Sequence, residues 1–314
     1  MTADPDLVIE LNKLTKYYGR SRGIIDVDLS VKRGEVFGFL GPNGAGKSTA
    51  IRTILDLIRP TSGWARVNGM DPTKEGAKVR RSVGYLPSDF GTYKSMTAKA
   101  YLHTLLEMMD YKGPDRIYEL AGRLDLDLKR RIKDFSRGNR QKIGVISAFM
   151  HNPKLVILDE PTTGLDPLMQ QEFYRIVLEE KGKGNTVFLS SHILTEVEAI
   201  CDRVGIIREG RLIIVENMST FKRKTGKVLN VEFDRKVDPD IFMRLEGVSH
   251  IRCGEGNVLI MTVSSHIDDV IKELARHLVI DLTYDEVSLE DLFLKYYGRE
   301  NASMKRNGAK VVVQ

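Results

Sequence analysis

One stretch of the sequence decides the fold: Val36-Phe-Gly-Phe-Leu-Gly-Pro-Asn-Gly-Ala-Gly-Lys-Ser-Thr49. Its first five residues are apolar or glycine, which is typical of a strand in a parallel sheet covered on both faces. The next eight fit the pattern G-x-x-x-x-G-K-[ST], and Ile51, Ile54, Leu55 and Ile58 then repeat at the spacing of one buried helix face. Strand, glycine-rich loop and helix in this order predict a phosphate-binding loop at a helix N-terminus.

The residue types in this loop explain how it would hold phosphate. Glycines let successive backbone N–H groups point at phosphate oxygens, and the helix N-terminus adds a partial positive charge. We expect Lys47 on the β- and γ-phosphates and the Ser48 hydroxyl on Mg²⁺. The predicted nucleotide-binding residues are Gly41, Pro42, Asn43, Gly44, Ala45, Gly46, Lys47, Ser48 and Thr49. The loop alone fits nucleotide kinases, GTPases, recombinases and transporters alike.

A second apolar run, Leu155–Leu158, ends in the two carboxylates Asp159 and Glu160. If this strand lies beside the phosphate loop, its carboxyl end meets the bound phosphates. Asp159 is then the predicted partner of Mg²⁺, and Glu160 the residue that orients and polarises the attacking water. The alternative is an acid that caps a turn, because Pro161 follows at once. This alternative role is harder to exclude for Glu160 than for Asp159.

Further motifs resemble a known family, the ATP-binding-cassette (ABC) ATPases. Phe135-Ser-Arg-Gly-Asn-Arg-Gln141 resembles their signature motif, Gly164-Leu-Asp-Pro167 their D-loop, and Ser190-Ser-His192 their switch-histidine loop. Tyr18 falls where such proteins stack an aromatic ring on adenine, with simple packing beside Tyr17 as the alternative. The order and spacing match over about 7–215, and this combination is far more specific than any single motif.

The resemblance implies a mechanism that needs two copies of the cassette. Two ATP molecules lie between them, each held by the phosphate loop of one chain and the signature motif of the other. Ser136 and Gly138 are thereby expected to contact the γ-phosphate in trans, and Asp166 to link the two sites. His192 would act with Glu160 in catalysis by holding the γ-phosphate and the water. The partner is a second ATP-binding subunit, either the same chain or a close paralogue.

Two motifs depart from the family pattern. The glutamine expected after Tyr85-Leu-Pro87 is replaced by Ser88, with Asp89 next, so the metal contact that this glutamine makes in the family has no assigned residue here. In the signature motif, Arg137 stands for a glycine and Asn139 for the glutamine. The serine and the second glycine remain, so contact with phosphate is still feasible.

Length and composition indicate two domains and no membrane span. The chain has 314 residues, 42% of them hydrophobic and 29% charged, with a net charge of +5 and two cysteines. No run approaches the ~20 apolar residues that a spanning helix needs, and the sequence shows no signal peptide. We expect a cytoplasmic protein, peripheral at the cytoplasmic face of the membrane, whose partner is a separate transmembrane permease.

The sequence pattern changes near residue 217. We assign 1–216 to an ABC ATP-binding domain, an α/β P-loop NTPase cassette with a helical subdomain, and 217–227 to a connector. Residues 228–298 follow as an accessory α+β domain, predicted from its β-α-β-β-α-β order as ferredoxin-like, with a helix at 289–297. Residues 299–314 are expected to be a flexible tail. The segment 287–293 resembles the ending of cassettes that pair with ABC-2-type permeases, mostly exporters.

The main alternative is an ABC ATPase that acts on nucleic acid or the ribosome. Ribosome-acting members carry two cassettes in one chain, and chromosome-maintenance members insert long coiled coils that the interval 49–135 has no room for. The basic clusters lack interleaved aromatic residues, so nucleic acid is not the expected partner. A nucleotide kinase would leave the signature motif and His192 without a role. We therefore predict an ATPase subunit that drives transport, with export as the expected direction.

Overall fold

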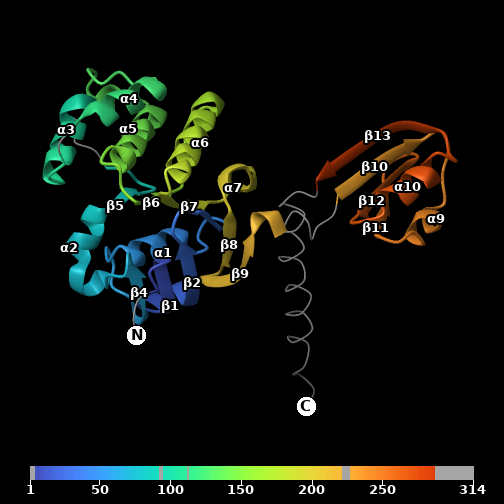
Figure 1. Ribbon diagram of the computed structural model, residues 1–314, viewed down its shortest axis with the longest axis horizontal. Coiled ribbons are helices and arrows are strands. Elements are labelled where there is room, and N and C mark those ends of the chain that lie inside the picture. Colours follow the sequence, from blue (N-terminus) through green and yellow to red (C-terminus); the bar gives the residue numbers. More distant parts are fainter. Residues whose placement is uncertain (1–3, 92–94, 112, 221–226, 287–314) are drawn as a thin grey trace, which may run out of the picture. The chain divides into compact units, whose positions relative to one another are not determined.

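The computed structural model describes residues 4–91, 95–111, 113–220 and 227–286. The chain divides into two compact units, Met1–Glu216 and Asn217–Gln314 (Figure 1). No helix within the described ranges is long and apolar enough to cross a bilayer. Each unit has a hydrophobic core of its own.

A six-stranded sheet forms the centre of the first unit, in the order β5-β6-β7-β3-β8-β9. The β3 strand pairs in parallel with β7 and β8, and β6 pairs in parallel with β5 and β7. Because β3, β6 and β7 are buried on both faces, β3 and β6 consist almost wholly of apolar residues, and β7 has an apolar centre from Val187 to Leu189. The strands are β3 (Val36–Leu40), β5 (Val83–Leu86), β6 (Leu155–Asp159), β7 (Thr186–Ser191), β8 (Arg203–Arg208) and β9 (Arg211–Asn217).

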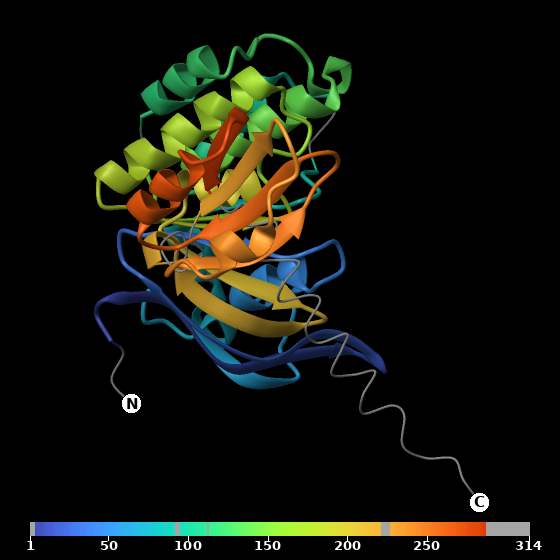
Figure 2. The same cartoon turned by 90° about the vertical axis from the view of Figure 1, so that its right-hand side faces the viewer.

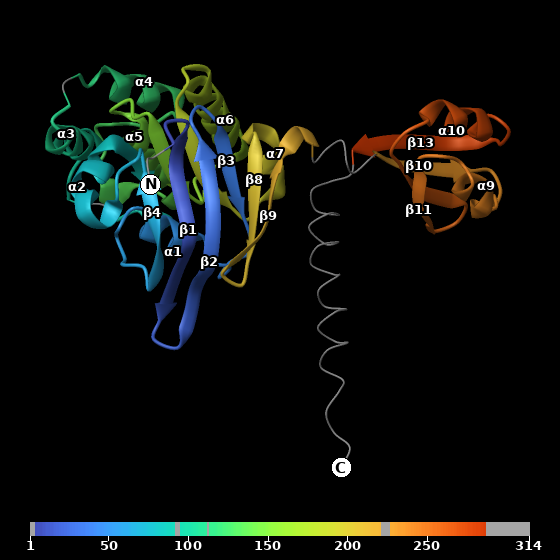
Figure 3. The same cartoon turned by 60° about the horizontal axis from the view of Figure 1, so that its bottom comes forward.

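A second, antiparallel sheet of the order β2-β1-β4 packs in the same unit. It consists of β1 (Leu7–Tyr18), β2 (Ser21–Lys32) and β4 (Ser62–Val67). The long β1–β2 hairpin is seen lengthwise in Figure 3 and from another side, in dark blue, in Figure 2. The apolar run Leu7–Leu11 suggests from sequence a strand of the parallel sheet, but the structure places it in this antiparallel sheet. Its pairing register shifts at several bulges, so its apolar residues do not follow one simple alternation.

Helices cover both sheets of the first unit and form a separate cluster at one end (Figure 1). Thr97 caps α3 and Ser136 caps α5 through their side-chain oxygens, and Asp166 caps α6 in the same way. The helices are α1 (Lys47–Ile54), α2 (Pro72–Ser82), α3 (Ala98–Met108), α4 (Asp115–Arg123), α5 (Arg137–Phe149), α6 (Pro167–Gly182) and α7 (Leu194–Ile200), with a short 3₁₀ turn at Ile132–Asp134.

The second unit is a four-stranded antiparallel sheet of the order β11-β12-β10-β13. Alternate residues of β10, such as Leu229 and Phe233, are buried together with Phe242 of α9 and Val270 of α10, so both helices lie on one face. The elements are β10 (Lys227–Phe233), α9 (Pro239–Met243), β11 (Val248–Cys253), β12 (Val258–Val263), α10 (Ile267–Leu274) and β13 (Val279–Glu286). The predicted helix at 289–297, the segment 287–293, the tail 299–314 and most of the connector lie outside the described residues.

Candidate ATP-hydrolysis site

The carboxyl ends of three neighbouring strands bring the phosphate loop and the catalytic candidates together. Parallel pairing places Asp159 of β6 opposite Ser190 of β7, and Ser191 of β7 opposite Leu40 of β3. The Gly41 N–H donates to the Ser191 carbonyl over 3.1 Å, which ties the start of the phosphate loop to the histidine loop. Sites in open α/β sheets form at this edge, where loops leave the carboxyl ends of the strands.

The phosphate loop turns into α1 through Gly46. This residue has a φ of 111°, a conformation that favours glycine, and a Cβ atom there would lie 2.7 Å from the Gly23 carbonyl oxygen. A Cβ atom on Gly23 would in turn lie 3.2 Å from the Tyr18 ring. Tyr18, 47% exposed, therefore stands beside the strand segment that packs on the loop, where a planar base could reach its ring.

Lys47 joins the loop to the carboxylates. Its buried ammonium group donates to the carbonyl oxygens of Gly41 at 2.6 Å and Pro42 at 3.1 Å. The same nitrogen lies 3.0 Å from Oε1 of Glu160. The positive charge that we expect on the phosphates is thus already held at the mouth of the loop, within reach of the predicted catalytic carboxylate.

Glu160 is held from three sides. Besides Lys47, its Oε2 lies 2.6 Å from Nδ1 of His192. Its backbone N–H donates to both the carbonyl and the hydroxyl oxygen of Ser190, each at 3.2 Å. With a φ of 55°, Glu160 adopts the left-handed conformation that is uncommon for a residue with a side chain. Such backbone strain concentrates at functional positions, where the surrounding contacts maintain it.

Asp159 has the properties of a Mg²⁺ partner. It is fully buried, and its Oδ1 accepts a hydrogen bond from the Ser190 hydroxyl at 2.6 Å. Its Oδ2 has no hydrogen-bond partner among the described residues. A buried carboxylate oxygen without a donor is costly, and a metal-bound water would supply one. Together with the Ser48 hydroxyl in the loop, this donor set of hard oxygen atoms fits Mg²⁺. Asp159 also helps to raise the pKa of Tyr85 to about 12, after the larger effect of burial.

The signature motif and the D-loop contact each other within the chain. A Cβ atom on Gly138 would lie 2.5 Å from the Gly164 carbonyl oxygen, so only glycine permits this approach. The Ser136 hydroxyl caps α5 by accepting from the Asn139 N–H at 3.2 Å, and Asp166 caps α6 by accepting from Met169 at 3.0 Å. No contact among the described residues joins Ser136, Gly138 or Asp166 to Lys47 or His192.

Sequence reasoning missed three polar residues that support the site. Gln141, although part of the quoted signature motif, was given no role; its amide donates to the Pro161 carbonyl at 2.9 Å and so ties α5 to the loop after Glu160. Ser190 bonds to Asp159 and to the Glu160 N–H, and its place in the Ser-Ser-His motif could have pointed to it. Glu196 had no motif of its own. Ser88 is half-buried and Asp89 exposed at the end of β5.

Comparison with known proteins identifies the family. The family model described as ABC transporter matches residues 24–163. The bacitracin transport ATP-binding protein BcrA of Bacillus licheniformis is 33% identical over 93% of this chain and 97% of its own length. The linearmycin resistance ATP-binding protein LnrL of Bacillus subtilis is 32% identical over 93% and 99%. A solved ATP-binding subunit of an ABC transporter superposes with a TM-score of 0.64 at 31% identity, over 69% of this chain and 92% of that one. The chain therefore belongs to the ABC transporter ATP-binding proteins and is an ATPase subunit that drives transport.

Proposed function

We propose that this chain powers the export of an antibiotic-like compound through a separate permease. The observation that carries this is the full-length similarity to BcrA and LnrL, whose names give bacitracin transport and linearmycin resistance. The similarity to BcrA and LnrL covers 93% of this chain, so it includes the second unit as well as the cassette. Proteins that share only the general ABC function need not resemble this chain in its second unit. We infer that this unit is a ferredoxin-like module, which its strand order and its two helices on one face support.

Each predicted site residue has a role in this proposal. The loop from Gly41 to Thr49 binds the phosphates of ATP, and Tyr18 stacks on adenine. Ser48 and Asp159 hold Mg²⁺, which neutralises charge on the β- and γ-phosphates when it is bound. Glu160 accepts a proton from the attacking water, and His192 orients Glu160 and the γ-phosphate. The 2.6 Å contact between His192 and Glu160 and the 3.0 Å contact between Glu160 and Lys47 support these roles.

Completion of the site requires a second copy. Ser136 and Gly138 stand at the N-terminus of α5, where backbone N–H groups favour an anion, yet no hydrogen bond or ion pair among the described residues links them to the phosphate loop of their own chain. We propose that they bind the γ-phosphate held by the partner's loop, and that Asp166 links the two sites. A bacterial ABC transporter cassette solved as a dimer is similar over 67% of this chain, with a TM-score of 0.59 at 25% identity.

The permease is proposed to bind near the end of β5. A cavity of about 260 Å³ lies there, lined by Tyr85, Phe90, Tyr101 and Met109 among others. Tyr85 and Phe90 of its lining flank Ser88, and in the family that the sequence resembles the residue at this position, a glutamine, connects the cassette to the permease. An aromatic pocket of this kind fits an apolar anchor from another chain. Because the energy source is ATP, we place the complex at the cytoplasmic face of a membrane.

The proposal is tested with Glu160→Gln, which keeps the shape of the side chain and removes the base. The variant should bind ATP as the wild type does, hydrolyse it about 100-fold more slowly and elute as a dimer in gel filtration with ATP. Glu107→Gln, on the exposed side of α3, is the matched control and should behave as wild type. A Glu160→Gln variant that hydrolyses ATP at the wild-type rate contradicts the catalytic role. Export is tested by co-expression with the permease gene: resistance to a peptide antibiotic should need both chains and fail with Glu160→Gln.

A further inference from the structure

A carboxyl group without a role in the proposed mechanism is buried beneath the two catalytic loops. Glu196 belongs to α7 and is 1% exposed, which is rare for an acid that forms no ion pair with any of the described residues. Burial raises the pKa of this carboxyl to about 7, against the opposing effect of the Ser191 and Thr162 hydroxyl groups. A buried acid is costly, so its presence at this point requires an explanation.

On one side, Glu196 holds the turn that carries His192. The Ser191 hydroxyl donates to Oε2 of Glu196 at 2.5 Å. The oxygen of that hydroxyl also accepts the Ile193 N–H at 2.9 Å, and so closes the turn around His192. The orientation of the histidine loop therefore depends on a hydroxyl group that Glu196 fixes. His192 is itself 42% exposed, so little else packs against its side chain.

On the other side, Glu196 meets the loop that follows Glu160. Thr162, buried at 3% exposure, lies close enough for its hydroxyl to lower the pKa of Glu196. The Thr162 carbonyl accepts the Leu165 N–H at 3.0 Å, and the Glu160 carbonyl accepts the Thr163 N–H at 3.3 Å. This short loop thus runs from Glu160 past Glu196 toward the D-loop.

We propose that Glu196 is a positioning residue for ATP hydrolysis: its carboxyl group fixes the turn that carries His192, and so the place of His192 beside Glu160. This rests on the proposed catalytic roles of those two residues. Glu196 touches neither ATP nor the attacking water. It acts through the Ser191 hydroxyl, and sets the contact between Nδ1 of His192 and Oε2 of Glu160.

The titratable groups around Glu196 belong to four elements. Glu160 follows β6 and disfavours its charge, while His192 follows β7 and favours it. Tyr174 of α6 and Cys201 at the end of α7 also respond to it, since Glu196 contributes to raising the pKa of both. Glu196→Gln cannot ionise but keeps an acceptor for the hydrogen bond from Ser191. This substitution therefore separates the effect of the side chain's position from the effect of its charge.

The experiment compares Glu196→Ala and Glu196→Gln in the full chain, with ATP and Mg²⁺. Glu196→Ala should lower kcat about 10- to 100-fold through misplacement of His192, and leave KM within about two-fold because the phosphate loop is intact. Glu196→Gln keeps an acceptor for Ser191 and should restore kcat to within about two-fold at pH 6, where the wild-type carboxyl is neutral. At pH 8 the two proteins should diverge, because only the wild type carries the charge. Glu198→Gln changes the same chemical group two residues along α7 and is the control.

Several results would overturn the proposal. One is a kcat of Glu196→Ala equal to that of the wild type, and another is a rise in KM that matches the fall in kcat. A Glu196→Gln variant that loses as much kcat at pH 6 as Glu196→Ala does would show that the hydrogen bond from Ser191 does not position His192. If Glu196→Ala does not fold, Ser191→Ala carries the test, with the same expected fall in kcat. A wild-type chain without ATPase activity would instead contradict the proposed catalytic roles of Glu160 and His192.

Discussion

Nδ1 of His192 lies 2.6 Å from Oε2 of Glu160, while Lys47 approaches the other oxygen of the same carboxylate at 3.0 Å. One carboxylate thus connects the histidine loop to the phosphate loop. The two residues are 32 positions apart in sequence, and parallel pairing of β6 with β7 brings them together. A residue that orients the catalytic base in this way acts on the rate more than on nucleotide affinity.

Replacement of His192 by alanine should therefore lower kcat and spare binding. We expect His192→Ala to reduce kcat about 100-fold, with the Kd for a fluorescent ATP analogue within about two-fold of wild type because Lys47 and the loop remain. Steady-state ATPase assays and equilibrium titration check the two values. His103 on α3, which is half-buried and hydrogen-bonded to Tyr118, supplies the control variant His103→Ala. An equal loss of affinity and rate in His192→Ala would instead assign the histidine to ground-state binding.

Gly138 should not tolerate a side chain. A methyl group there would lie 2.5 Å from the Gly164 carbonyl oxygen, so either α5 or the D-loop must move. We expect Gly138→Ala to cost about 1–3 kcal/mol of stability, and to abolish ATP-dependent dimerisation because Ser136 and Asp166 lie at the displaced segments.

Gly182→Ala is the matched control, since a Cβ atom at Gly182 meets nothing within 4 Å. Denaturant unfolding and gel filtration in ATP give the two readouts. If Gly138→Ala dimerises with ATP as wild type does, the close approach of the signature motif to the D-loop has no part in the partner site.

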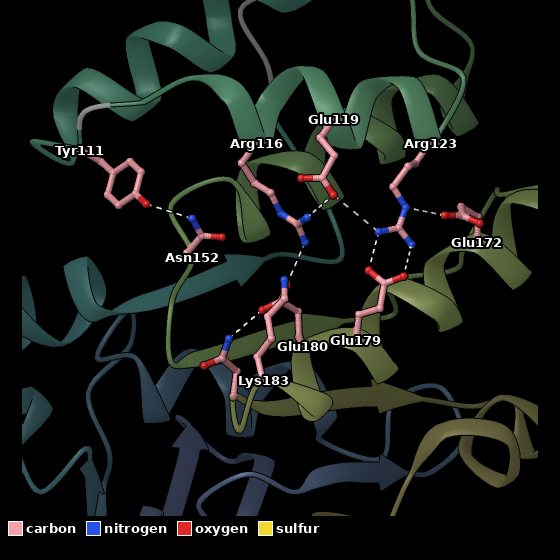
Figure 4. A network of polar contacts seen from close by, with 10 residues as sticks. Tyr111, Arg116, Glu119, Arg123, Asn152, Glu172, Glu179, Glu180 and Lys183 are labelled. Carbon is pink, nitrogen blue, oxygen red and sulfur yellow. Dashed lines mark hydrogen bonds and ion pairs between the residues drawn. The ribbon is translucent and has the colours of Figure 1, made fainter.

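A buried ionic network joins α4 to α6 (Figure 4). Arg116, 10% exposed, bonds to Oε1 of Glu180, 2% exposed, at 2.8 Å. Arg123 reaches from the same helix to Glu172 and Glu179. Loss of one partner of a buried pair leaves the other charge uncompensated, which is more costly than the pair is stabilising.

Arg116→Met should therefore lower the free energy of unfolding by about 3 kcal/mol, at the low end of such effects because Lys183 and Asn185 also bond to Glu180. Lys78→Ala, which removes an exposed pair with Glu75, should cost less than about 1 kcal/mol. Unfolding in urea can be followed by the fluorescence of Trp64, the single tryptophan of the chain, which lies in β4 of the first unit. Equal losses of unfolding free energy in the two variants would mean that the buried network stabilises the protein no more than an exposed ion pair does.

The strands that form the edge of the sheet at the candidate site could be predicted from sequence, because the signals for them are local. The strand Val36–Leu40, the loop and the strand ending at Asp159 each combine an unbroken apolar run with a motif of fixed spacing. The break between α3 and α4 is likewise marked by a local signal, the helix-breaking pair Gly113-Pro114.

The antiparallel sheet and the supporting shell could not be predicted in this way. In β1 the bulges around Leu11, Leu14 and Lys16 interrupt the alternation that marks a strand with one buried face. Gln141 and Glu196 find their partners 20 and 5 residues away, across loops whose approach depends on the whole fold. Sequence spacing in a single chain does not indicate which of these contacts form. Polar residues that support a site in this way are therefore not predicted from the sequence alone.

Glu196 should also make the stability of the first unit depend on pH. Its pKa is raised from 4.5 to about 7 by burial, so the folded state binds the proton more tightly than the unfolded state. Stability is therefore unaffected below about pH 4.5, falls as pH rises from there to about 7, and stays reduced above that, by on the order of 3 kcal/mol. Glu196→Gln cannot ionise and escapes this loss. Its melting temperature, followed by Trp64 fluorescence, should be similar to that of the wild type at pH 5 and higher at pH 8. A difference that is the same at both values would mean that the carboxyl is already charged at pH 5, and that the hydrogen bond from Ser191 is enough to stabilise the charge.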